Sequence, residues 1–260
     1  MKKILREERH IRILREVNSH GQVTATGLSQ DFGVSEITIR RDLRDLADEG
    51  LLRRTYGGAV AAQSEVTQPP VLQRMSWKRT YKEIIGRAAA QLVNDGDSIF
   101  IGSGSTTTYV ARELVNKEKL TIVTNALNIA TELATVEGIT VIVIGGLMRS
   151  SELSLVGHIA EKALQEVRMD KVIMGIPAIH LEAGLTNDFM PEVMTDRALL
   201  SMTNEFILVA DHTKFDKVCS AYLSPISEVT SLVTDYKTDK SMLESIRKLG
   251  VSVIVAQENR

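Results

Sequence analysis

The sequence predicts an α/β protein of two domains, a small helical N-terminal domain followed by a larger domain with a mostly parallel sheet. Residues 4–60 contain compact helical patterns that end in a Gly-Gly turn. From residue 78 onward, amphipathic helices alternate with short apolar runs rich in β-branched residues. Apolar strands separated by helices are typical of a parallel sheet that is covered on both faces.

The length and composition agree with a two-domain globular protein. The chain has 260 residues, of which 43% are hydrophobic and 25% charged. No apolar run reaches the roughly 18 residues that a membrane-spanning helix needs, and the N-terminal residues carry too many charges for a secretory leader. The single cysteine, Cys219, excludes an internal disulfide and a zinc site built from cysteines. We therefore expect a cytoplasmic protein with neither metal nor cofactor.

The charge balance gives little indication of a partner. The formal net charge is −2, whereas nucleic-acid-binding proteins often have a basic excess. Residues 1–60 carry 11 Lys and Arg against 9 Asp and Glu, which is only a weak positive bias. DNA binding must therefore be argued from where the charges lie.

Three helices are expected in the N-terminal domain, residues 1–60. The first covers residues 4–18, where apolar side chains recur at helical spacing. Thr24 can cap a second helix that Gly33 ends, and Ser35 can cap a third because its hydroxyl can accept from a free backbone N–H. The third helix has one apolar face, formed by Ile39, Leu43, Leu46 and Ala47.

The third helix also carries an arginine-rich face. Arg40, Arg41 and Arg44 lie off the apolar face and are expected to point mostly outward. Two helices joined by a tight glycine turn, the second with such a face, form the helix-turn-helix pattern. In the major groove of DNA, arginine can bind guanine or phosphate.

Residues 51–60 predict two short strands around a turn, which would form a wing. Arg53, Arg54 and Tyr56 could then reach the DNA backbone or the minor groove. An arginine-rich helix is often only a solvated face with local ion pairs, and Asp42 and Asp45 are available for these. The arrangement of helix, turn, helix and wing nevertheless favours a winged helix-turn-helix DNA-binding domain.

A longer motif resembles a known family. Residues 34–43 (VSEITIRRDL), followed by Gly50 and residues 54–59 (RTYGGA), resemble the DNA-binding signature of the DeoR family of regulators. One departure is Tyr56, where members often carry histidine, and the resemblance continues through the second domain. The residues expected to contact DNA are Ser35, Glu36, Ile37, Thr38, Arg40, Arg41, Arg44, Arg53, Arg54 and Tyr56.

Residues 61–77 are predicted to be a linker, because the Pro69-Pro70 pair cannot continue a helix. Residues 78–260 then form the second domain. Its strands are expected at 98–101, 120–123, 140–144, 171–174, 206–209, 231–233 and 251–255.

A glycine- and hydroxyl-rich loop follows the first of these strands. Residues 102–107 (GSGSTT) lead directly into a helix, and free N–H groups at a helix start together with hydroxyls suit a phosphate. Many Gly-x-Gly segments are only tight turns. Asn125, Gly146, Asp211 and Lys214 follow other strands, and ligands of parallel sheets bind at the carboxyl ends of strands. Lys214 could also be an exposed loop lysine, and Gly146 only part of a turn.

The resemblance implies more about this second domain. In the DeoR family it is similar to ribose-5-phosphate isomerase, responds to sugar phosphates and acts as a sensor. Residues 184–192 are expected to complete the pocket, whereas residues 175–178 (GIPA) replace an acidic or polar residue that relatives commonly carry. The residues expected to bind the effector are Gly102, Ser103, Gly104, Ser105, Thr106, Thr107, Asn125, Gly146, Arg149, Glu192, Asp211 and Lys214.

The favoured hypothesis is a transcription regulator, expected to be a repressor, of a carbohydrate-metabolism operon. Its partners would be double-stranded operator DNA and a phosphorylated sugar or related metabolite. A pseudo-palindromic operator would require a homo-oligomer, a dimer or a tetramer.

The sequence also allows two other functions. A sugar-phosphate isomerase with an accessory DNA-binding head would need a carboxylate base, for which Asp211 and Glu192 are candidates. The missing carboxylate at 175–178 argues against this enzyme, so no catalytic residue is expected. A nucleotide-binding module is disfavoured because residues 102–107 are neither Gly-x-Gly-x-x-Gly nor followed by a P-loop lysine.

Overall fold

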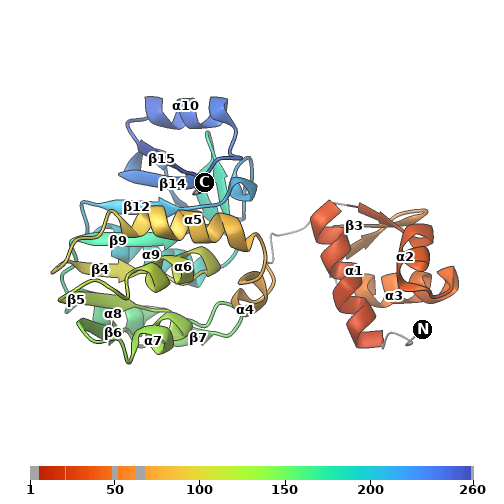
Figure 1. Cartoon of the computed structure of the whole chain (residues 1–260), viewed down its shortest axis with the longest axis horizontal. Coiled ribbons are helices and arrows are strands. Elements are labelled where there is room, and N and C mark those ends of the chain that lie inside the picture. Colours follow the sequence, from red (N-terminus) through yellow and green to blue (C-terminus); the bar gives the residue numbers. More distant parts are fainter. Residues whose placement is uncertain (1–5, 21, 49–51, 62–67, 259–260) are drawn as a thin grey trace. The chain divides into compact units, whose positions relative to one another are not determined.

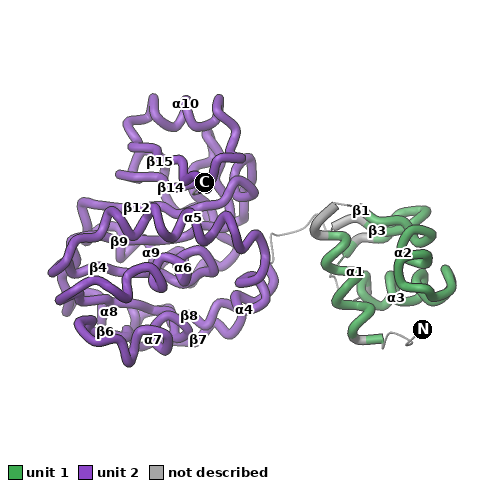
Figure 2. The backbone as a smooth tube through the Cα atoms, viewed as in Figure 1, with its two compact units in different colours: residues 1–66 green, residues 67–260 purple. Residues whose placement is uncertain are grey.

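The computed structural model describes residues 6–20, 22–48, 52–61 and 68–258. The chain divides into two compact units, residues 1–66 and residues 67–260 (Figure 2). Each unit has its own buried apolar core and is described by itself.

The first unit contains the helices α1, α2 and α3 (Figure 1) and a small antiparallel sheet with strand order β1-β3-β2. Its elements are α1 (Arg6–His20), β1 (Gln22–Thr24), α2 (Ala25–Phe32), α3 (Glu36–Asp48), β2 (Leu52–Arg54) and β3 (Gly58–Ala61). Strands β2 and β3 form the hairpin expected as a wing, and β1 adds a third strand that the sequence analysis did not include.

Local signals in the sequence explain where these helices begin and end. The Thr24 hydroxyl accepts a hydrogen bond from the Gly27 amide at 3.1 Å, which caps α2. Gly33 ends that helix in the left-handed conformation, with φ of 63°. The Ser35 hydroxyl accepts from the Thr38 amide at 3.2 Å, so α3 starts one residue later, as its sequence predicts.

The second unit is built on a parallel sheet of seven strands in the order β15-β14-β12-β9-β4-β5-β6. The strands are β4 (Ser98–Ile101), β5 (Leu120–Thr124), β6 (Ile139–Val143), β9 (Lys171–Gly175), β12 (Phe206–Val209), β14 (Ser231–Asp235) and β15 (Ser252–Ala256). All seven expected strands are present within about two residues of their predicted ends, which confirms the predicted fold class.

Helices cover both faces of this sheet. On one face, α5 (Arg79–Ala90), α6 (Ser105–Glu113) and α7 (Leu127–Leu133) pack in one apolar cluster with strand residues such as Ile99 and Ile122. On the other face, a second cluster joins strand residues such as Phe100 and Val172 to α8 (His158–Gln165), α9 (Met190–Leu200) and α10 (Lys240–Lys248).

Several short strands were not predicted. They are β7 (Leu147–Arg149), β8 (Ser154–Val156), β10 (Ala178–His180), β11 (Gly184–Asn187) and β13 (Ala221–Ser224). Strands β10, β11 and β13 form a small antiparallel sheet, and β7 pairs with β8. The strand β6 lies at the edge of the parallel sheet, with Ile142 and Val143 exposed.

The segment of residues 68–77, which we call the connector, was expected to be part of the linker. Residues 62–67 of that linker lie outside the described residues. The connector contains the short helix α4 (Val71–Arg74) and belongs to the second unit. The Val71 amide donates to the Ser151 carbonyl at 2.7 Å, and the Tyr109 hydroxyl donates to the Met75 carbonyl at 3.0 Å.

Candidate functional site

The outer face of α3 presents the arginines singled out in the sequence. Arg40, Arg41 and Arg44 are all exposed. Arg40 forms an ion pair at 3.3 Å with Glu36, one turn earlier on the same helix. Ile37 is 81% exposed on the same helix, so its apolar side chain is accessible to a partner. The helix therefore offers cationic groups together with one apolar contact.

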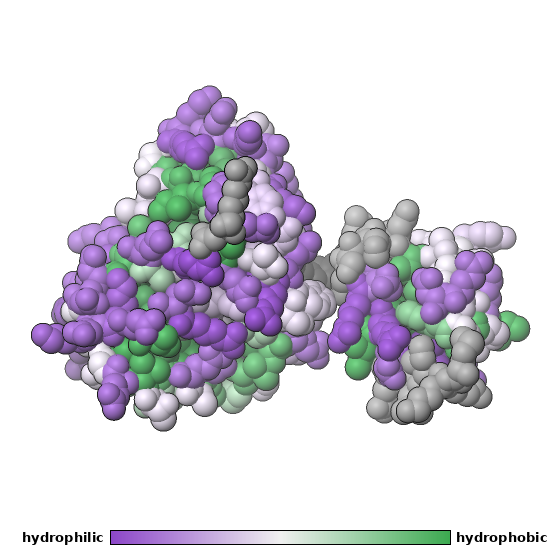
Figure 3. Space-filling view, viewed as in Figure 1, coloured by the Kyte–Doolittle hydropathy of each residue, from purple (hydrophilic) through white to green (hydrophobic). Residues whose placement is uncertain are grey.

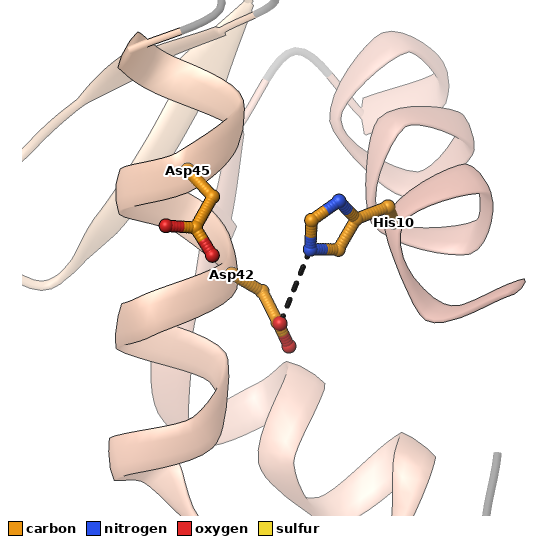
Figure 4. A group of neighbouring side chains, drawn as sticks. All are labelled: His10, Asp42 and Asp45. Carbon is orange, nitrogen blue, oxygen red and sulfur yellow. Dashed lines mark hydrogen bonds and ion pairs between the residues drawn. The ribbon is translucent and has the colours of Figure 1, made fainter. Parts of the chain in front are cut away.

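Two aspartates of α3, Asp42 and Asp45, pair with α1 instead of with these arginines. Asp42 is buried and accepts hydrogen bonds from Arg9 at 2.5 and 2.9 Å. His10 lies 3.2 Å from the same carboxylate (Figure 4), and Asp45 pairs with Arg6 at 2.7 Å. His10, Asp42 and Asp45 place potential metal ligands within 4.8 Å of one another. The guanidinium of Arg9 on Asp42 opposes a cation there, so the cluster is better explained as a brace between two helices.

The hairpin β2–β3 supplies the remaining candidates for DNA contact. Arg54 and Tyr56 are exposed, and Tyr56 is fully so. Arg53 lies in β2, but its side chain is outside the description. At the start of α3, the Glu36 carboxylate accepts from the Thr26 hydroxyl of α2 at 2.5 Å. Glu36 thus holds two helices together, a role that its sequence position did not indicate.

A pocket lies in the second unit at the carboxyl ends of β4 and β9. It is lined by Gln68, Arg74, Gly102, Ser103, Gly104, Ser105, Thr106, Arg149, Glu152, Met174, Gly175, Ile176, Pro177, Asn187, Asp188, Glu192, Asp196, Val209 and Lys214. Eight of the twelve predicted effector residues are therefore brought together there, namely Gly102, Ser103, Gly104, Ser105, Thr106, Arg149, Glu192 and Lys214.

The glycine-rich loop forms one wall of the pocket. Gly104 is the N-cap of α6 with φ of 143°, a conformation that favours glycine, and it provides no side-chain acceptor to the first helical turn. The hydroxyls of Thr107 and Thr108 both donate back to the Gly104 carbonyl. The backbone amides at the start of α6 remain as donors for an anion, which the positive end of the helix dipole also favours.

Lys214 is the cation that faces this wall. Among the pocket-lining residues that the structure describes, it is the basic side chain without a carboxylate at ion-pair distance, since Arg74 pairs with Glu152 and Arg149 pairs with Asp188 and Glu192. Burial lowers the pKa of Lys214 to about 8, although the charge of Asp211 acts in the opposite direction. The ammonium can therefore still bind an anion at neutral pH.

Glu192 is held by several donors on the opposite wall. Its carboxylate accepts from Arg149 at 2.5 Å, from Ser103 at 3.1 Å, from Asn187 at 3.1 Å and from Ser154 at 3.2 Å. These contacts fix the carboxylate. Asp196 also lines the pocket, and burial and the negative charge of Glu192 raise its pKa well above the usual range.

Four predicted effector residues do not line the pocket. Asn125 is buried, and its side-chain oxygen accepts from the Ser103 amide at 3.1 Å, so it shapes the loop. Thr107 turns its hydroxyl back to Gly104. Gly146 lies where a Cβ atom would come within 2.7 Å of the Val156 carbonyl, so it serves strand pairing. Asp211 caps the short helix that carries Lys214, by accepting from the Thr213 amide at 2.9 Å.

Several other lining residues have no local signal in the sequence and were not predicted. Gln68 and Arg74 lie in the connector, where the Pro-Pro pair suggested only a linker. Glu152 comes from the turn between β7 and β8, neither of which was predicted. Asp188 lies in the segment expected to complete the pocket but was not chosen, and Asp196 lies on α9. These residues line the same pocket only because the tertiary fold brings distant segments together.

Comparison with known protein families covers both units. The DeoR-like helix-turn-helix domain matches residues 9–65, and the DeoR C terminal sensor domain matches residues 77–236. The chain belongs to the DeoR family. The predicted family resemblance is thereby confirmed, and this DeoR-family protein is a DNA-binding transcriptional regulator.

Individual relatives resemble the DeoR-family chain over nearly its whole length. The transcriptional repressor AccR of Agrobacterium fabrum is 33% identical over 252 residues, 96% of this chain and 97% of the relative. The glycerol-3-phosphate regulon repressor of Escherichia coli is 34% identical over 237 residues, 91% of this chain and 94% of the relative. Ribose 5-phosphate isomerase A from Neisseria gonorrhoeae covers 52% of this chain at 20% identity with a TM-score of 0.39, so the isomerase-like fold stays a prediction.

The surface of this DeoR-family protein and the length of its helices were compared with what a membrane-spanning protein requires. Hydrophilic side chains dominate the face drawn in Figure 3, with smaller hydrophobic patches between them. Within the described part of the chain, no helix combines the length and apolar character needed to cross a membrane.

Proposed function

We propose that this regulator binds a phosphorylated sugar, or a related phosphorylated metabolite, in the pocket of its second unit, and that occupancy of the pocket controls its binding to operator DNA. The observation that carries the proposal is the position of Lys214, which lines the same pocket as the uncapped start of α6. A dianion there would accept from backbone amides and from one ammonium group.

The hydroxyls of the loop support the same assignment. Ser105 and Thr106 line the pocket, and within the described structure neither hydroxyl is recorded in a hydrogen bond to protein. Both are therefore available to phosphate oxygens. A neutral ligand would gain little from the helix dipole or from Lys214, so the site favours a phosphate ester over the free sugar.

The other end of the pocket suits a polyol in part. Asn187, Asp188 and Glu192 offer amide and carboxylate oxygens that can bind hydroxyl groups. Ile176 and Pro177 form an apolar wall at the end of β9, where relatives were expected to carry an acidic or polar residue. The ligand is expected to present carbon, not a hydroxyl, to that wall.

The DNA end of the proposal rests on α3 and the β2–β3 hairpin. We expect Arg40, Arg41 and Arg44 to contact phosphates or guanines, and Ile37 to contact a thymine methyl in the major groove. The two relatives described above are named as repressors, one of a glycerol-3-phosphate regulon. We therefore propose a repressor of a carbohydrate-metabolism operon that acts as a homo-oligomer on paired half-sites.

Calorimetry on the full chain tests the ligand proposal. Glycerol 3-phosphate and ribose 5-phosphate would be titrated beside glycerol and ribose. Each phosphate ester should bind at least about tenfold more tightly than its free polyol or sugar, because only the ester can use the charge-assisted contacts. Equal affinity for both members of each pair would refute the phosphate site while leaving the regulator assignment intact.

A further inference from the structure

The connector contributes two side chains to the ligand pocket that have donors left over. Gln68 and Arg74 both line the pocket. The Gln68 Nε2 amide and the Arg74 Nε group are buried and have no hydrogen-bond partner within the described structure. A buried N–H group without a partner is uncommon and calls for an explanation such as a bound ligand. Both donors come from the same short segment of chain.

The remaining contacts of Arg74 keep its side chain in place. One terminal nitrogen donates to the Gln68 side-chain oxygen, and the other forms an ion pair with Glu152. Both partners of that ion pair are nearly buried. Behind them, the Nζ atom of Lys82 donates to the Arg74 carbonyl. The guanidinium is thus oriented before any ligand arrives, with its Nε–H unused.

Arg74 lies within electrostatic range of two other cations, Lys82 and Lys214. Burial first, and then the nearby charges of Lys214 and Arg74, lower the pKa of Lys82 to about 7. The charge of Arg74 also helps to lower the pKa of Lys214. Burial raises the pKa of Glu152 despite its pairing with Arg74. The three cations are therefore close enough to repel one another, and Asp211 and Glu152 offset part of this repulsion.

We propose that Arg74 and Gln68 bind the phosphate group of the effector together with Lys214, so that the ligand fastens the connector to the second unit. This inference rests on the proposed function, because it assumes that the pocket binds a phosphorylated metabolite. The connector begins directly after the boundary between the two units at residues 66 and 67. A bound ligand would thereby restrain the segment of chain that leads to the DNA-binding unit.

Glu152 distinguishes this proposal from a purely structural role of Arg74. If Arg74 binds phosphate, Glu152 competes with the phosphate for the same guanidinium. Glu152→Gln should then tighten phosphate binding, by about threefold or more, because the competing charge is removed while the shape is kept. If Arg74 only anchors the connector, the same variant should weaken the fold and leave phosphate affinity unchanged or reduced.

The experiment uses the full chain with inorganic phosphate as the probe. Calorimetry measures the affinity for phosphate, and hydrogen exchange measures the protection of the backbone amides. Phosphate should slow amide exchange in peptides that cover residues 68–77. Arg74→Gln should weaken phosphate binding about tenfold, and Gln68→Leu about threefold. Arg112→Gln is the matched control, because Arg112 is a cation of the same unit that pairs with Glu132 and does not line the pocket. That control should bind phosphate like the parent chain.

The outcomes separate the two proposals. Binding that is lost in Lys214→Met but unchanged in Gln68→Leu and Glu152→Gln, with no change of exchange in residues 68–77, would overturn the role of the connector and leave the proposed function standing. Absence of phosphate binding to the parent chain would overturn both. If Arg74→Gln fails to fold, Gln68→Leu and Glu152→Gln decide the question, since neither removes the arginine.

Discussion

Asp42 of α3 and Arg9 of α1 form a buried two-point ion pair in the DNA-binding unit. The Arg9 Nε atom lies 2.5 Å from one carboxylate oxygen of Asp42, and Nη2 lies 2.9 Å from the other. Both side chains are less than 10% exposed. Because α3 carries the arginines expected to contact DNA, this pair fixes the helix that the function depends on.

Asp42→Asn should destabilise the first unit by about 3 kcal/mol, since it leaves the Arg9 charge in a buried place without its counter-charge. Asp45→Asn is the control. Its partner Arg6 is 64% exposed, so the change should cost less than about 1 kcal/mol. Urea unfolding, monitored by hydrogen exchange in peptides of α1 and α3, measures the change in stability of the first unit in both variants. Equal, small effects of the two variants would show that the buried pair has no special importance.

Arg40→Ala or Arg41→Ala should weaken operator binding by about 1–3 kcal/mol if the side chain binds a base. If it contacts only phosphate, binding should weaken on all sequences, and the slope of log affinity against log salt should decrease by about one. Fluorescence anisotropy at several salt concentrations distinguishes the two cases. Arg87→Ala, an exposed arginine of the second unit, serves as the control. Full operator affinity in the Arg40/Arg41 double variant would exclude the docking of α3.

Phosphate affinity should decrease as pH rises through about 8. Lys214 must be protonated to bind an anion, and burial lowers its pKa to about 8, with Arg74 and Lys217 adding repulsion and Asp211 and Glu152 opposing it. The contribution of the Lys214 charge to affinity is thus complete below this pKa and is lost above it. Lys214→Arg should bind phosphate without this decline up to about pH 10, because guanidinium stays charged. Calorimetry between pH 7 and pH 9.5 checks the prediction, and an equally steep decline in Lys214→Arg would contradict it.

Lys82→Met should stabilise the second unit at neutral pH. The pKa of Lys82 is lowered from 10.5 to about 7, chiefly by burial, so the unfolded chain binds an extra proton between these values. Stability then increases as pH rises from about 7 towards 10.5, and the cost of burying the amine is complete below about 7. The gain in Lys82→Met should reach roughly 5 kcal/mol near pH 6.5, less the lost contact with Arg74, and fall towards zero near pH 10.

Denaturant unfolding at the two pH values measures this gain. Lys248→Met is the control, because Lys248 is exposed on α10 and should show no such trend. A gain in Lys82→Met that is the same at both pH values would mean that Lys82 is not titrating as proposed.

No conversion of ribose 5-phosphate should be detectable when the chain is incubated with it. Isomerisation needs a free carboxylate base. Glu192 already accepts hydrogen bonds from Arg149, Ser103, Ser154 and Asn187. The end of β9 lines the pocket with Met174, Gly175, Ile176 and Pro177, none of which carries a carboxylate. A coupled assay for ribulose 5-phosphate, with ribose 5-phosphate isomerase as positive control, checks this. Turnover that is abolished by Glu192→Gln would revive the enzyme hypothesis.

Local sequence determined much of this protein. Local signals predicted where helices of the first unit begin and end, because such signals act within one helical turn. They are the caps Thr24 and Ser35 and the terminating glycine Gly33. Apolar runs predicted all seven strands of the parallel sheet, because strands buried in such a sheet are apolar along nearly their whole length. The loop at 102–107 could be chosen for a similar reason, as it joins one strand to the next helix.

Only the tertiary structure decided which side chains share the pocket. Asn125 and Asp211 follow strands as expected, yet they hold the loop and the turn instead of lining the cavity. Asp42 was open to pairing with arginines of its own helix, but it is buried against Arg9, 33 residues away. Arg74 reaches the pocket because the connector packs on the second unit. Such contacts depend on how elements distant in sequence pack, and periodicity and capping, which act over a few residues, carry no information about them.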